Sequence, residues 1–242
     1  MRLVLLSLFL LGGLSGVAQP RWTFGLQGAY LYSIAQRSGN EDVKDFYRQE
    51  HLPTASGGFL VQYRAGSRVQ LESGLHLTGI GFRHVFSSTF PSGARLSQST
   101  NQSFACFKVP VHVRYALGTV SLPLLNMVQT YAVAGPTILF RTEYASRTVR
   151  YGNNWTASAA TGPFLGVGAH LGLGVQKRLP RGDAFVSSVF VQLGFNRLAD
   201  SHWEYQANGT TYSGKTVNRG HFLGTGLAYL FRPYGLRRKS HA

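Results

Sequence analysis

The chain has 242 residues, a formal net charge of +15 and only 14% charged residues, together with 29 glycines, 12 tyrosines and 16 phenylalanines. Soluble domains typically carry about 25% charged residues, so the composition argues against a soluble enzyme and favours strands that face lipid. A basic chain often binds nucleic acid, but an export signal and the positions of the charges, both described below, argue against that partner.

The first segment has the features of a secretory signal peptide. Arg2 supplies the positive charge, an apolar run extends from Leu3 to Leu11, and Gly16-Val17-Ala18 offers the small residues that signal peptidase recognises. A retained N-terminal anchor is the alternative, but a helical membrane span needs about 20 apolar residues. We therefore predict a signal peptide over residues 1–18. The lone Cys106 follows too late to be a lipid-anchor cysteine.

Alternation of apolar and small or polar residues is the main signal in the rest of the chain. In Phe164–Gln176, the odd positions from Leu165 to Val175 are all apolar, whereas the even positions from Gly166 to Gln176 are Gly, His or Gln. A strand separates these two sets, and a helix would mix them. The expected strands, in chain order, are Trp22–Ile34, Ser56–Ala65, Arg68–His84, Ser103–Ala116, Met127–Glu143, Phe164–Gln176, Phe185–Ala199 and Gly220–Arg232.

The connections between these strands alternate in length. The short ones are Ala65-Gly66-Ser67, Leu117–Asn126 and Arg178–Gly182, and the long ones are Ala35–Ala55, Val85–Gln102, Ala145–Ala160 and Asp200–Arg219. Short periplasmic turns and long extracellular loops are typical of outer-membrane barrels. The sequence therefore predicts an all-β fold with one domain over residues 19–232. That domain is an eight-stranded antiparallel up-and-down transmembrane β-barrel, and residues 233–242 form a basic periplasmic tail.

A soluble lipocalin-like barrel, with its apolar face inside, is the structural alternative. The non-apolar face here is mostly Gly, Ala, Thr and Gln, and it has few of the Lys and Glu residues that a water-facing surface carries. The apolar face also ends in aromatics that suit the two membrane interfaces, namely Trp22, Tyr30, Tyr32, Tyr115, Tyr229 and Phe231. Both features favour the membrane barrel.

Several segments resemble the PorT-like outer-membrane β-barrel family. They are FGLQGAYLYS from Phe24, GGFLVQY with VQLESGLHLTGIGF, the central FKVPVHVRY, YAVAGPTILF and FLGVGAHLGLGV. The resemblance covers nearly all of the mature chain and implies an outer-membrane location in a Gram-negative envelope. It implies little about activity, since many members have no assigned role and one branch takes part in protein secretion. The basic tail departs from the terminal aromatic with which such barrels often end.

Strand parity places a polar cluster inside the barrel: Glu72, His76, Lys108, His112 and Arg114. Eight strands enclose a lumen that side chains fill, so inward glycines make room for these groups and a water-filled pore is not expected. Glu72 is the only acid among them, and we expect it to pair with Arg114 because an unpaired buried carboxylate is costly. A packed polar plug is favoured over a polar site or proton path.

No convincing catalytic or metal site is evident in the sequence. Small outer-membrane barrels include acyltransferases and deacylases that use Ser or Ser/His sets near the outer leaflet, and His84 with Ser87 and Ser88 is the one candidate arrangement. The eight histidines lack metal-ligand spacing. We expect a non-enzymatic barrel without cofactor or metal, and keep a lipid-modifying enzyme as the alternative.

Basic residues gather at the expected periplasmic rim and tail: Arg64, Arg68, Lys177, Arg178, Arg181, Arg237, Arg238 and Lys239. Three interpretations stay open, namely contact with anionic lipid headgroups, docking of a periplasmic or envelope protein, and a merely solvated rim. The sequence thus predicts a structural or interaction component of the outer membrane, with lipid as its immediate surroundings.

Overall fold

The computed structural model describes residues 21–39, 47–89, 95–123, 126–141, 146–151, 155–161, 164–180, 182–207 and 210–231. The predicted signal peptide, residues 1–18, and the predicted basic tail, residues 233–242, lie outside these ranges. Within the described ranges, no helix is long and apolar enough to cross a membrane.

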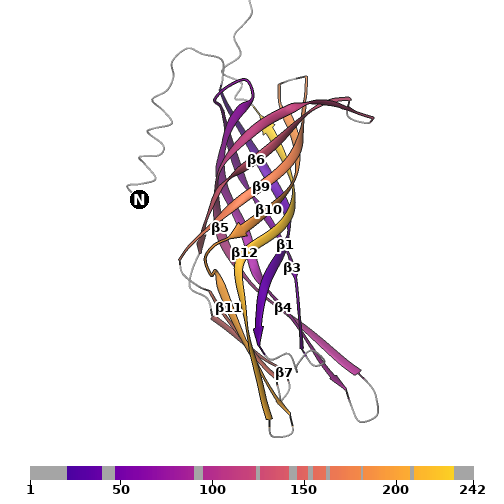
Figure 1. Cartoon of the computed structure of the whole chain (residues 1–242), viewed down its shortest axis with the longest axis vertical. Coiled ribbons are helices and arrows are strands. Elements are labelled where there is room, and N and C mark those ends of the chain that lie inside the picture. The colour runs from indigo at the N-terminus through magenta and orange to yellow at the C-terminus, as the bar shows by residue number, and fades with distance from the viewer. Residues whose placement is uncertain are drawn as a thin grey trace, which may run out of the picture.

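Eight strands form a closed ring in which each strand is antiparallel to both of its neighbours (Figure 1). In ring order they are β1 (Trp22–Gly39), β3 (Leu52–Arg64), β4 (Val69–Thr89), β5 (Arg95–Leu122), β6 (Asn126–Arg141), β9 (Leu165–Arg178), β10 (Ala184–Gly194) and β12 (Thr210–Phe231). The pairing of β1 with β12 closes the ring, from Phe24 opposite Phe231 to Gly39 opposite Gly214. The predicted up-and-down barrel is confirmed.

The expected boundaries at the extracellular end are wrong, because much of the long connections is paired strand. β4 and β5 continue their ladder to Thr89 opposite Arg95, through most of the loop predicted over Val85–Gln102. Residues of this stretch such as Val85 and Gln102 are buried, which favours the continued pairing. Four further strands lie at this end: β2 (Tyr47–Glu50), β7 (Ser146–Tyr151), β8 (Trp155–Thr161) and β11 (Ala199–Ala207).

These extra strands extend the barrel beyond the membrane. β2 pairs with β4, whereas β11 pairs with β12 and carries β8 and then β7 on its other side. They lie at the lower end of Figure 1, opposite the short turns that join β3 to β4, β5 to β6 and β9 to β10. The barrel therefore has a short-turn end, which is periplasmic, and an extended extracellular end.

An apolar belt surrounds the outside of the ring. Phe59 on β3 is 67% exposed and Leu227 on β12 is 69% exposed. Large apolar side chains are also exposed on the neighbouring strands, for example Leu26, Leu71, Leu75, Val111, Leu171, Leu173, Val189 and Leu223. A monomeric soluble protein rarely exposes a patch of this extent. The belt is the surface that lipid covers in a membrane barrel.

Aromatic side chains are found at both edges of the belt. At the periplasmic edge, the Trp22 and Tyr63 rings lie 4.8 Å apart, and those of Phe185 and Tyr229 lie 5.1 Å apart. The Tyr229 hydroxyl donates a hydrogen bond to Asp183 in the periplasmic turn (2.7 Å). Tyr30, Tyr32, Phe164 and Phe195 are exposed toward the extracellular edge. Amphipathic rings at both boundaries match the girdles of an outer-membrane barrel.

The belt yields a test of the membrane-facing surface. Replacing Leu227 by Arg should lower the free energy of unfolding in lipid vesicles by about 2–4 kcal/mol, because the charge enters the middle of the apolar belt. The control is Thr211→Arg on the exposed extracellular part of the same strand, which should change it by less than about 0.5 kcal/mol. Denaturant unfolding followed by tryptophan fluorescence measures both. Equal, small effects would show that Leu227 does not face lipid.

Candidate functional site

The lumen holds the five polar residues that the sequence places inside the barrel. Glu72, His76, Lys108, His112 and Arg114 are all buried, with side chains that come from β4 and β5. Antiparallel pairing sets Glu72 opposite His112, and His76 opposite Lys108. Alternate residues on both strands point inward, so the ladder stacks these groups along the barrel axis.

Glu72 and Arg114 form the predicted ion pair. Arg114 Nη2 lies 2.6 Å from Glu72 Oε2, and the same oxygen accepts a hydrogen bond from Gln62 (2.9 Å). Arg114 also donates to Gln176 (3.3 Å), and its guanidinium carbon lies 4.0 Å from the centre of the Tyr131 ring. Residues of five strands, β3, β4, β5, β6 and β9, therefore hold one buried carboxylate and one buried guanidinium.

A layer of imidazoles lies next to this pair on the extracellular side. His112 Nδ1 is 3.7 Å from Glu72 Oε1, and the His112 ring stacks on His170 with centroids 4.3 Å apart. His170 in turn packs against Phe190 (4.6 Å), and Lys108 Nζ lies 5.7 Å from the centre of that ring. The cavity that these residues line has a volume of about 20 Å³, which is room for about one water molecule.

Inward glycines make this packing possible. A Cβ at Gly174 would lie 2.3 Å from the Tyr131 hydroxyl, and one at Gly224 would lie 2.6 Å from the Phe190 ring. A Cβ at Gly58 would come within 2.7 Å of the His76 ring. The glycine-rich inner face therefore leaves space for aromatic rings and for imidazoles, where the sequence predicted space for long polar groups alone.

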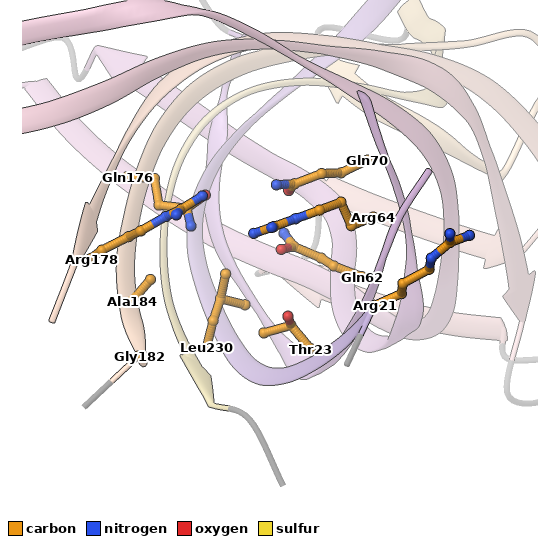
Figure 2. Close-up of a pocket in the computed structure, with 10 residues that line it drawn as sticks. All are labelled: Arg21, Thr23, Gln62, Arg64, Gln70, Gln176, Arg178, Gly182, Ala184 and Leu230. Carbon is orange, nitrogen blue, oxygen red and sulfur yellow. The ribbon is translucent and has the colours of Figure 1, made fainter. Parts of the chain in front are cut away.

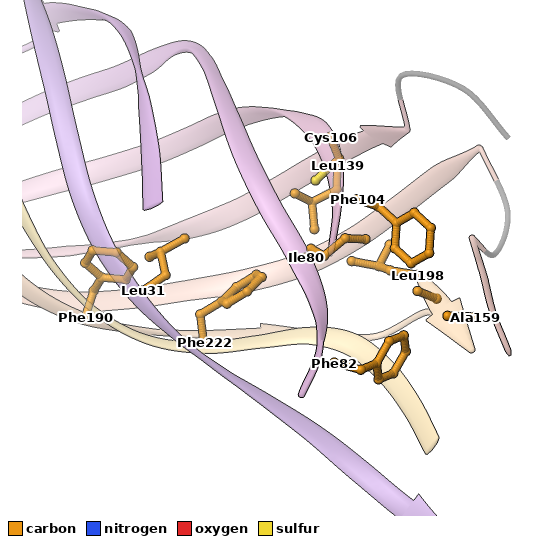
Figure 3. Close-up of a cluster of buried hydrophobic side chains, with 11 residues drawn as sticks. Leu31, Ile80, Phe82, Phe104, Cys106, Leu139, Ala159, Phe190, Leu198 and Phe222 are labelled. Atoms are coloured by element: carbon orange, nitrogen blue, oxygen red, sulfur yellow. The ribbon is translucent and has the colours of Figure 1, made fainter. Parts of the chain in front are cut away.

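An apolar plug fills the lumen on the extracellular side of the imidazoles. Figure 3 shows its side chains meeting from several strands, and its buried members are Leu31, Ile80, Phe82, Phe104, Cys106, Leu139, Ala159, Phe190, Leu198, Ala199 and Phe222. This plug was not predicted from the sequence, because the inward positions were expected to be polar. Strand parity places Ile80 and Phe82 on the same inner face as Glu72 and His76. The sequence therefore already indicated apolar side chains inside the barrel.

A buried polar clasp lies beyond the plug, where β2, β4, β5 and β11 meet. His84 Nδ1 is 2.8 Å from the Tyr47 hydroxyl, and His84 Nε2 is 3.1 Å from Ser201 Oγ. Tyr47 stacks on Trp203 with centroids 4.4 Å apart, and Gln102 accepts a hydrogen bond from Ser201 (3.4 Å). Burial lowers the pKa of His84 to about 4, opposed by its hydrogen bond with Gln102.

The clasp corrects the candidate arrangement of His84 with Ser87 and Ser88. Ser87 has the opposite strand parity to His84, so the two side chains lie on opposite faces of β4; the side chain of Ser88 lies outside the described part. The serine beside His84 is Ser201, a residue distant in sequence that β11 brings into contact. His84 and Ser201 both have 0% exposure, so the pair is closed off from solvent in this structure.

Within the part of the chain that the structure describes, no group of three or more His, Cys, Asp or Glu residues could hold a metal ion.

The basic periplasmic rim divides into inward and outward groups. Arg64 and Arg178 line the mouth of the lumen, as Figure 2 shows, whereas Arg68 is exposed in the turn between β3 and β4. Lys177 Nζ donates to the carbonyl of Met127 on the neighbouring strand (3.4 Å). The other predicted rim residues, Arg181, Arg237, Arg238 and Lys239, lie outside the described residues.

A closed antiparallel ring with an apolar exterior, aromatic edges and a filled polar lumen defines an outer-membrane β-barrel, and the protein is one. Its place in the outer membrane follows from that surface. No family model matches the sequence, and a search of curated proteins finds no match.

Solved structures of similar architecture are outer-membrane proteins. OprG from Pseudomonas aeruginosa is 11% identical with a TM-score of 0.47, and the match covers 89% of this chain and 99% of OprG. AlkL is 11% identical with a TM-score of 0.40, covering 93% and 96%. The Escherichia coli outer membrane protease OmpT is 8% identical with a TM-score of 0.31, covering 90% and 99%. Their functions are not transferred to this chain.

The ion pair yields a test of the packed lumen. Replacing Glu72 by Gln leaves the Arg114 charge buried without its counter-charge, which should lower the free energy of unfolding by about 3–5 kcal/mol. Replacing Arg114 by Met in the same chain should recover part of that loss, because both charges are then absent. Denaturant titration in lipid vesicles measures all three proteins. A stable Glu72→Gln barrel would contradict a structural role for the pair.

Proposed function

We propose that this protein is a non-enzymatic outer-membrane barrel that acts as a structural or interaction component of the cell envelope. The filling of the lumen carries the proposal. The polar network, the imidazole layer, the apolar plug and the clasp occupy the lumen in succession. The cavity beside Glu72 and Lys108 measures about 20 Å³. Because the interior is filled, we expect this barrel to act through its outer surfaces. These are the periplasmic rim, the apolar belt and the extracellular extension.

We further propose that the protein belongs to the PorT-like family and that it is linked to protein secretion. The segment Phe107–Tyr115, FKVPVHVRY, resembles that family and supports membership. This part of β5 also supplies the buried Lys108, His112 and Arg114 to the lumen. A segment that builds the interior is constrained by packing on one face and by lipid on the other. Resemblance there therefore concerns the architecture of the barrel more than any one partner.

The periplasmic rim is the surface we propose for a partner. Arg68 is exposed at the tip of a short turn. The predicted tail, which carries Arg237, Arg238 and Lys239, follows β12, whose last residue, Phe231, lies at the short-turn end of the barrel. Clustered positive charge steers association with an acidic surface. An envelope protein with an acidic periplasmic face is the kind of partner that this rim fits.

A lipid-modifying enzyme at the outer leaflet is the second candidate, favoured by one observation. Ser201 Oγ lies 3.1 Å from His84 Nε2, which is within the hydrogen-bond reach of a nucleophile and its base. Its burial beneath β2 and the stacked Tyr47–Trp203 rings opposes catalysis, since an ester would have to displace the clasp. Opening of the extracellular end would be needed for this pair to act.

Site-specific photocrosslinking in intact envelopes tests the proposal. A photoreactive residue at position 68 on the periplasmic rim should trap a discrete protein adduct, and one at the extracellular position 211 should not trap the same adduct. Absence of an adduct at position 68, or the same adduct at both positions, would contradict a periplasmic partner.

The enzyme alternative has its own readout in the same cells. Mass spectrometry of outer-membrane lipids should give the same acyl-chain profile with the wild-type protein, with Ser201→Ala and without the protein. An acyl-chain change that requires the wild-type protein and disappears with Ser201→Ala would replace the proposal by the enzyme.

A further inference from the structure

The lumen cavity beside Glu72 is lined by a buried donor that has no acceptor. Arg114 is only 5% exposed, and its two terminal nitrogens bind Glu72 and Gln176. Its third nitrogen, Nε, is buried without a hydrogen-bond partner. An arginine nitrogen can only donate, so the group that satisfies Arg114 Nε has to be an acceptor.

Lys108 lines the same cavity as a second buried cation, also 5% exposed. Among the described residues no carboxylate forms an ion pair with it, and its Nζ lies 5.7 Å from the centre of the Phe190 ring. Glu72 is the one carboxylate among the described lining residues, and Arg114 and Gln62 both bind its Oε2. With the imidazoles counted as neutral, two cations and one carboxylate line the cavity, so one positive charge is left over.

Three imidazole nitrogens along this cavity also lack a hydrogen-bond partner. They are His76 Nε2, His112 Nδ1 and His170 Nδ1, and all three atoms are buried. A ring nitrogen donates or accepts according to its tautomer, and a protonated ring donates from both nitrogens. Folded proteins leave few buried polar atoms unsatisfied, and several around one small cavity indicate a water molecule or an ion.

Size and charge together select the class of ligand. The cavity volume of about 20 Å³ holds about one water-sized sphere, which excludes phosphate, sulfate and organic anions. A water molecule fits and accepts hydrogen bonds, but it leaves the extra buried charge uncompensated, which is costly. A monatomic halide is little larger than water, accepts hydrogen bonds from several donors and also cancels that charge.

We propose that the barrel binds one chloride-class ion in this cavity, held by Lys108 Nζ and Arg114 Nε. The apolar plug closes the extracellular side of the lumen, so the ion enters while the barrel folds or during a local opening. A bound ion needs no route through the lumen, and the site therefore agrees with a closed barrel. Its role is to complete the charge balance of the interior.

Refolding in two salts tests the site with chloride as the probe. The denatured protein is refolded into neutral detergent micelles with sodium chloride, or with sodium gluconate at the same ionic strength, because gluconate is too large for the cavity. Chloride at roughly one hundred times its Kd should raise the thermal midpoint by roughly 5–10 °C, as expected for a ligand that binds only the folded state. The midpoint is read from the loss of the heat-modifiable folded band on a gel. Equal midpoints in the two salts would overturn the proposal.

The same substitution at two lysines separates the site from general effects of chloride. Lys108→Met removes the buried cation and keeps a long side chain against Phe190, so its midpoint should be the same in both salts. Lys215→Met is the matched control, because Lys215 lies on the extracellular part of β12 and pairs with Asp200 (3.2 Å). It should keep the wild-type shift. A shift of equal size in the wild type and both variants would reduce the effect to a general action of the salt and would overturn the site.

Bromide gives a measurement that holds even if Lys108→Met fails to fold. Crystals of the wild-type barrel refolded in sodium bromide should show an anomalous-scattering peak in the cavity lined by Lys108 and Arg114. Bromide peaks confined to the protein surface would overturn the proposal.

Discussion

The pairing of β1 with β12 is the constraint on which the rest of the structure depends. In lipid an unpaired strand edge leaves backbone N–H and C=O groups without partners, at a cost of several kcal/mol for each group. Closing the ring removes both edges and at the same time defines an inside and an outside. Strand alternation then assigns almost every side chain to lipid or to lumen. The apolar belt and the buried polar cluster are two consequences of this one closure.

The lumen changes character along the barrel axis. The periplasmic mouth is basic and open. Around Glu72 the lumen holds charged groups that pair with one another, and on the extracellular side of Phe190 it is apolar. The extracellular clasp then returns to polar groups that bond one another. This order separates the buried Glu72 from the extracellular side, with the apolar plug in between. The result is a barrel whose two ends present different chemistry while its centre is closed.

Much of this architecture is predictable from the sequence, and the rest fails for identifiable reasons. Alternation gives the ring strands, and the lone acid Glu72 among inward cations gives its pairing with Arg114. The strand ends at the extracellular side are not predictable from alternation, because outward residues beyond the membrane are polar and look like loop. The Ser201–His84 contact joins residues 117 positions apart, and the pairing of β11 with β8 and β12 creates it. The placement of Arg64 and Arg178 at one mouth of the lumen depends in the same way on the order of the strands around the ring.

Ion flux through reconstituted liposomes tests the central claim of a closed and filled barrel most directly. Folding of the reconstituted protein is verified beforehand by its change in gel mobility on boiling. The structure predicts that liposomes carrying the folded wild-type barrel release a trapped monovalent ion no faster than protein-free liposomes. A steady flux that scales with the amount of folded barrel would contradict a lumen blocked by the polar network and the apolar plug.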